Sequence, residues 1–95
     1  MVTFNPGLSG SIPSSVGSMT RLFMLILSHN QLSGSIPSLE ALVLLSQLSL
    51  NQNQLSGLIP SLGALRLLDY LYLDGNLLTG SIPMELEALV DLHFL

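Results

Sequence analysis

The 95-residue chain has no cysteine and only two basic residues, and these absences exclude several classes of protein. Without cysteine there is no disulfide framework, no thiolate metal site and no thiol nucleophile. Arg21 and Arg66 stand against six acidic residues, which gives a net charge of −4. Nucleic acid is therefore not an expected partner, because it selects for a basic surface.

Long apolar runs are also missing, although the mean hydropathy is +0.64. The longest run, residues 22–27, has six residues, whereas a membrane-spanning helix needs roughly 20. We therefore expect no direct membrane insertion by this segment. Residues 1–7 show no basic or apolar stretch typical of a signal peptide, and no Asn-x-Ser/Thr glycosylation site occurs. The residues themselves assign no compartment.

What the chain does have is an internal repeat. Four prolines that follow Ser/Thr-Gly-x-Ile are spaced by 24, 23 and 23 residues: Pro13, Pro37, Pro60 and Pro83. A fixed period of this length is typical of a solenoid. We expect a single array over residues 1–95, divided into a partial repeat 1–21, whole repeats 22–44, 45–67 and 68–91, and a partial repeat 92–95.

Within each repeat the spacing of large apolar residues changes from two to three. Spacing of two predicts a strand: Leu25 and Leu27, Leu48 and Leu50, Leu71 and Leu73. Spacing of three predicts a tight 3₁₀-like return: Val16, Met19 and Leu22; Leu39, Leu42 and Leu45; Leu62, Leu65 and Leu68; Leu86, Leu89 and Leu92. We expect all of these side chains to point inward, so that the 25 leucines of stacked coils fill one elongated core.

Polar residues recur at the end of each predicted strand. Asn30, Asn53 and Asn76 follow the second strand leucine by three residues, where the chain must turn. An inward amide can satisfy buried backbone groups of its own coil and of the neighbouring coil, so we expect an asparagine ladder. The glycine four residues after each asparagine is expected to permit a tight bend or a close approach of coils.

The frame LxxLxLxxNxLSGxIP, which residues 22–37 spell and which returns from Leu45 and Leu68, resembles the plant-type leucine-rich repeat. The resemblance implies an α/β fold, a right-handed solenoid with a short parallel sheet on its concave face. The resemblance covers essentially the whole chain. The chain also resembles the extracellular parts of receptor-like kinases, receptor-like proteins and polygalacturonase inhibitors. The resemblance therefore implies a non-catalytic module that recognises a protein or peptide. A full-length parent is expected at the cell surface or outside the cell, and a kinase domain could belong to that parent.

In this architecture the residues beside the inward strand leucines face outward and are free to serve a ligand. We name nine of them the concave strip: Met24, Ile26, Ser28, Gln47, Ser49, Asn51, Tyr70, Tyr72 and Asp74. Phe94 is expected to begin a fourth outward row, with Leu95 aligned to Leu25. Tyr70 and Tyr72 are the expected anchors, because tyrosine brings contact area and a hydrogen bond at a low entropic cost. The alternative at each position is an ordinary solvated strand residue.

Enzymatic and metal-binding hypotheses find little support. His29 and His93 fall in different coils, and the acidic residues Asp69, Asp74, Glu85, Glu87 and Asp91 suit a solvated face. We expect no catalytic residue, no cofactor and no metal site.

A second hypothesis remains open beside the recognition module. The first copy has Pro6 where the ladder asparagine should stand, and both ends are apolar, so the chain could be an uncapped fragment or structural remnant. Such a remnant would associate with itself through its ends and have no dedicated ligand.

Overall fold

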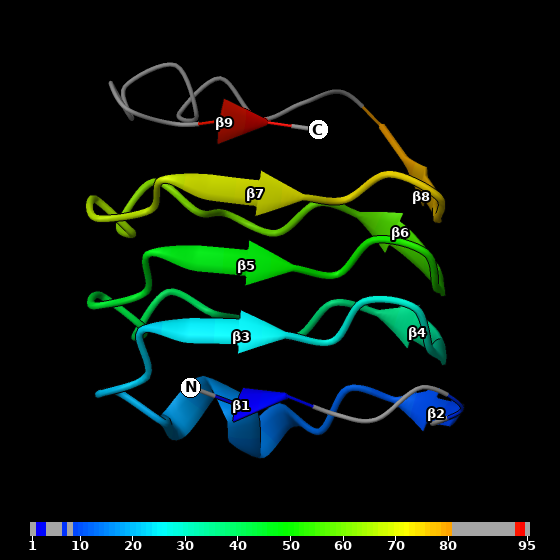
Figure 1. The fold of residues 1–95 in the computed structure, drawn as a ribbon, viewed down its shortest axis with the longest axis horizontal. Coiled ribbons are helices and arrows are strands. Elements are labelled where there is room, and N and C mark those ends of the chain that lie inside the picture. The colour runs from blue at the N-terminus through cyan, green and yellow to red at the C-terminus, as the bar shows by residue number, and fades with distance from the viewer. Residues whose placement is uncertain (1, 4–6, 8, 81–92, 95) are drawn as a thin grey trace.

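The computed structural model is a solenoid in which residues 2–3, 7, 9–80 and 93–94 are described (Figure 1). The strands are β1 (Val2–Thr3), β2 (Ser9–Ser11), β3 (Met24–Ile26), β4 (Gln31–Ser35), β5 (Gln47–Ser49), β6 (Gln54–Leu58), β7 (Tyr70–Tyr72), β8 (Leu77–Thr79) and β9 (His93–Phe94). They form two parallel sheets: the first sheet, β1-β3-β5-β7-β9, and the second sheet, β2-β4-β6-β8. Each full coil gives one strand to each sheet, which confirms the predicted solenoid.

The first sheet and the core beneath it follow the leucine spacing. Leu25 pairs with Leu48, and Leu48 with Leu71, and each is at most 1% exposed. Equivalent leucines of successive coils thus form a continuous column, as the spacing of two predicts. The buried apolar residues of the described part are Ile12, Val16, Leu22, Leu25, Leu27, Leu32, Ile36, Leu39, Leu42, Leu45, Leu48, Leu50, Leu55, Leu62, Leu65, Leu68, Leu71 and Leu73.

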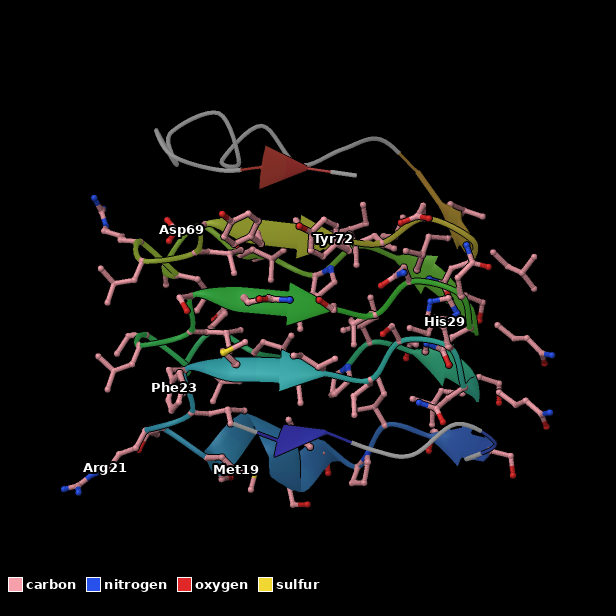
Figure 2. The ribbon with its side chains drawn as sticks, viewed as in Figure 1. Met19, Arg21, Phe23, His29, Asp69 and Tyr72 are labelled. Carbon is pink, nitrogen blue, oxygen red and sulfur yellow. The ribbon has the colours of Figure 1, made fainter. Side chains whose placement is uncertain are left out.

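The returns between the sheets are successive tight turns. The N–H of Leu42 donates to the carbonyl of Leu39, and that of Leu45 to Leu42, both at 3.0 Å, and the next return repeats this pattern. The first return instead contains the 3₁₀ helix η1 (Ser14–Ser18). There the prediction for Met19 is wrong: its side chain is 45% exposed (Figure 2). Met19 lies just after η1, at φ −85° and ψ 69°, in a return with one residue more than the later ones.

The second sheet is a feature that the sequence reasoning missed. Its strands contain the Ser-Gly segments, so Gly34 and Gly57 lie inside β4 and β6, whereas Gly80 lies at a bend just after β8. Gly57, inside β6, has a φ of 81°, which an L-residue adopts only with strain. Each long strand of this sheet still buries one leucine, Leu32 in β4 and Leu55 in β6. The second sheet therefore closes the other side of the same core.

The last strand of the first sheet is one residue out of the expected register. β9 pairs His93 with Tyr70 and Phe94 with Leu71. The step from β7 to β9 is therefore 23 residues, as it is between β3, β5 and β7, whereas aligning Leu95 with Leu25 assumes a step of 24. The alignment of Leu95 with Leu25 is therefore wrong, because Phe94 has the register position of Leu25, Leu48 and Leu71, and the row expected to begin at Phe94 is out of register with the other three.

Candidate functional site

The first sheet sets the concave strip in register from coil to coil. Its strands align Met24 with Gln47 and Tyr70, and Ile26 with Ser49 and Tyr72. The positions just beyond the strands continue this order, because the N–H of His29 donates to the carbonyl of Asn51 at 3.0 Å and that of Gln52 to Asp74 at 2.9 Å. The nine residues thus form three columns that cross three coils.

Exposure varies along the strip. Tyr70 and Asp74 are exposed, and Met24, Ile26, Ser28, Gln47, Asn51 and Tyr72 are half-buried. Ser49 differs from the expectation, because it is only 4% exposed. Its hydroxyl accepts a hydrogen bond of 2.9 Å from Nε2 of Gln47 on the same strand. The small side chain lies between the larger Ile26 and Tyr72 of the neighbouring strands, which leaves little of its surface accessible.

The most prominent feature of the strip is an aromatic pair on β7. The rings of Tyr70 and Tyr72 stack with their centroids 6.1 Å apart and their planes at 25°. Beyond them, Asp74 approaches Nε2 of Gln52, which donates to its carboxylate at 3.4 Å. The strip therefore runs from an apolar row on β3, through amides on β5, to an aromatic and acidic row at β7.

The corners behind the strip are held by the asparagine ladder. Asn53, which is 8% exposed, donates through Nδ2 to the carbonyl of Leu50 in its own coil at 3.1 Å and to that of Leu27 in the preceding coil at 2.9 Å. Its Oδ1 accepts from the N–H of Leu32 at 3.1 Å. One amide thus joins the end of β3 to β4 and to the next coil. This arrangement fixes the first sheet on a rigid corner.

Asn76 repeats the same bonds one coil later. It donates to the carbonyls of Leu50 and Leu73 at 2.9 and 3.1 Å, and accepts from Leu55 at 3.0 Å. Asn30 donates to Leu27 at 3.0 Å. No buried side-chain nitrogen or oxygen lacks a partner in the described part of the chain.

Comparison with known protein families finds the same repeats. The model of the Leucine Rich Repeat family matches residues 21–41, 44–65 and 67–89, which is more than half of the chain. The chain belongs to the leucine-rich repeat family. No curated protein sequence matches it.

Several solved structures of plant proteins are similar to this leucine-rich repeat chain. The Arabidopsis receptor kinase HAESA, crystallised with the peptide hormone IDA and the co-receptor SERK1, is 41% identical over 94% of this chain, with a TM-score of 0.85. The ectodomain of GASSHO1/SCHENGEN3 from Arabidopsis thaliana, in complex with CASPARIAN STRIP INTEGRITY FACTOR 2, is 41% identical over 96%, with a TM-score of 0.89. A plant ice-binding protein is 36% identical over 90%, with a TM-score of 0.76. The chain spans 15%, 11% and 28% of these three proteins.

The outer face of the second sheet carries exposed serines that the sequence analysis did not single out. We name four exposed serines of this leucine-rich repeat array the serine patch: Ser11, Ser33, Ser35 and Ser56. The sheet pairs Ser11 with Ser33, and Ser35 with Ser56. Leu58 and Leu77, which are 67% and 66% exposed, continue the face toward β8. The signal that could have found this patch is the repeat itself, because exposed hydroxyls return at one place in each coil.

The described acidic and histidine side chains lie apart from one another on the surface. The described part of the structure contains no group of three His, Asp or Glu side chains able to hold a metal ion. His29 is exposed at a corner between β3 and β4 (Figure 2). Glu85, Glu87 and Asp91 lie outside the described residues. Within residues 9–80 and the other described positions, no helix has the length and apolar character needed to cross a membrane.

Proposed function

We propose that this chain is a non-catalytic recognition module that displays a protein or peptide ligand on the concave strip. The observation that carries the proposal is the contrast between the two faces of one sheet. The buried column is the same leucine in three successive coils, while the outward position beside it changes from Met24 to Gln47 to Tyr70. Outward side chains that the core does not determine are free to be chosen for a ligand.

Recognition at this strip depends on side chains rather than on added strands. The strands β3, β5 and β7 each have a parallel partner on both sides, so their backbone groups are already paired. A ligand that lies across them must therefore contact outward side chains. Tyr70 and Tyr72 provide the largest rigid contact area there, which makes them the expected hot spot.

The similar structures support this proposal. HAESA is described in complex with a peptide hormone and a co-receptor, and the GASSHO1/SCHENGEN3 ectodomain in complex with a further factor. We infer a protein or peptide partner for this chain as well, and a parent protein that presents the array at the cell surface.

A peptide-library selection tests the proposal. Twelve-residue random peptides displayed on phage would be selected on the 95-residue chain and then measured against Tyr70→Ala/Tyr72→Ala. Loss of two hot-spot side chains should weaken the selected peptides by roughly tenfold or more. The matched control is Val43→Ala/Leu67→Ala, which removes two apolar side chains that are 49% and 54% exposed on the returns. Equal binding by both double variants would contradict the concave site.

Self-association is the competing explanation and has its own readout. A remnant without a ligand would show a mass in light scattering that rises with concentration, whether or not the two tyrosines are present. Selection of no peptide, together with such a rise, would favour that alternative over the recognition module.

The serine patch favours a second candidate function, the binding of ice. Its paired serines, Ser11 with Ser33 and Ser35 with Ser56, place hydroxyls on neighbouring strands about 4.7–4.9 Å apart, and regularly spaced hydroxyls suit a periodic solid. Similarity to a plant ice-binding protein supports the idea. Freezing-point hysteresis of the purified chain should then disappear in Ser33→Lys/Ser56→Lys and persist in Tyr70→Ala/Tyr72→Ala. Absence of hysteresis in the unchanged chain would refute it.

A further inference from the structure

Positive charge is absent from the strands of the first sheet. None of β1, β3, β5, β7 and β9 contains a lysine or an arginine. Both arginines lie on the returns, and Figure 2 shows Arg21 directed away from the sheet at the edge where the strands begin. The strip therefore has no cation of its own to hold an anionic ligand.

Negative charge borders the aromatic pair. Asp69 and Asp74 lie just before and just after β7, so that the two tyrosines stand between two carboxylates along one coil. Tyr70, Tyr72 and Asp74 are two residues apart in turn, which places them on one face with successive members about 6–7 Å apart. The hydrogen bond from Gln52 holds the Asp74 carboxylate at the end of this row.

This combination is suited to a cationic side chain. A guanidinium or ammonium group is attracted to the face of a tyrosine ring, and a nearby carboxylate adds to that attraction. The exposed ring of Tyr70 and the half-buried ring of Tyr72 offer neighbouring faces in a stacked arrangement. An acidic group at the same place would be repelled by Asp74 and would find no positive partner on the strip.

The other end of the strip selects for an apolar group. Met24 and Ile26 are half-buried on β3, two strands away from β7. At about 4.7–4.9 Å per strand this separation is about 9–10 Å, which an extended peptide covers in about three residues. The amide Gln47 lies between the two ends.

We propose that the ligand of the concave strip is an extended peptide that lies across the strands with a lysine or arginine over Tyr70 and Tyr72. An apolar residue two to four positions away would then contact Met24 and Ile26. This inference rests on the proposed recognition function and adds the charge and the spacing of the ligand.

The test uses the peptides selected from the random library on the full 95-residue chain. Lysine and arginine should be enriched over the starting library, two to four positions from an apolar residue, and aspartate and glutamate should be depleted. A selected peptide resynthesised with alanine in place of its basic residue should bind about three- to fivefold more weakly, as expected for an exposed cation–π contact. Glutamate at that position should weaken binding further, and the difference in affinity between the basic and the glutamate peptide should shrink as salt is added.

Protein variants test whether the preference for a basic residue arises at Asp74 and the two tyrosine rings. Asp74→Asn should weaken the basic peptide but not its alanine form, whereas Glu40→Gln, which removes an exposed carboxylate on a return, should change neither. Tyr70→Phe/Tyr72→Phe keeps the rings and should retain the preference for a basic residue, which also controls for folding.

The two proposals fail in different ways. Selected peptides that depend on the tyrosines but show no enrichment of basic residues would overturn this inference and leave the recognition site standing. Peptides that bind equally well to Tyr70→Ala/Tyr72→Ala, or no selected peptide at all, would overturn both.

Discussion

The two sheets of this solenoid share one core but differ in what they present to solvent. On the first sheet the outward residues change in every coil, so each strand offers a different surface. On the second sheet the Ser-Gly segment returns in β2, β4 and β6, although the strands pair with a shift that aligns Ser33 with Gln54 and Ser56 with Leu77. The fold can keep both sheets because each buries leucines against the same core. The first sheet thus has outward residues that vary between coils, whereas the strands of the second sheet share a repeated sequence segment.

The largest effect tests whether the two sheets contribute equally to that core. Leu48 in β5 and Leu55 in β6 are 1% and 0% exposed, so Leu48→Ala and Leu55→Ala should each lower the free energy of unfolding by about 2–5 kcal/mol. Urea denaturation followed by circular dichroism measures both. A loss confined to Leu48→Ala would show that the second sheet is an appendage rather than half of the scaffold.

The next effect concerns the corner that joins the sheets. Asn53→Leu leaves the N–H of Leu32 without its amide partner and removes one of the two amides that donate to the carbonyl of Leu27, so it should destabilise the chain by about 1–3 kcal/mol. Gln54→Leu is the matched control, because it makes the same kind of change at the exposed next position. An unchanged melting temperature for Asn53→Leu would argue against a stabilising ladder.

A smaller effect tests the glycine that only the second sheet needs. A Cβ added at Gly57 would meet Cβ of Ser35 at 3.6 Å, an ordinary contact, so space is not the constraint. The constraint is the φ of 81°, so Gly57→Ala should destabilise the chain by about 1–2 kcal/mol. Ser56→Ala, at the exposed neighbour, should be close to neutral. If both variants unfold at the same urea concentration, the left-handed backbone is not a constraint on this sheet.

How far the sequence predicts the structure differs between the same two sheets. The first sheet and the returns could be predicted, because leucines spaced by two and by three record which side chains point inward. The second sheet could not, because Ser and Gly are not typical strand residues and their pairing depends on the neighbouring coil.

Parts of the site escaped prediction for related reasons. The burial of Ser49 depends on the size of the side chains beside it, which the sequence of one coil does not contain. The exposure of Met19 and the register of Phe94 both depend on a difference of one residue in the length of a return. A repeat pattern fixes the positions within a coil better than it fixes the step between coils.

The smallest expected effect on stability distinguishes the backbone of the corner from that of the strand β6, which follows it. Gln52 and His29 each have a φ of 59°, and Gly75 takes the equivalent place with a φ of 71°, so this corner is left-handed in all three coils. Gln52→Gly relieves a strain of about 1–2 kcal/mol but adds about 0.5–1 kcal/mol of chain entropy to the unfolded state. The free energy of unfolding should therefore stay the same or rise, by at most about 1.5 kcal/mol. Gln54→Gly, two residues later in β6, relieves no such strain and should destabilise by about 0.5–1 kcal/mol. If both variants lost the same free energy of unfolding, the backbone of the corner would not be left-handed in solution. The position of the ladder asparagine behind the corner would then be determined by the strands alone.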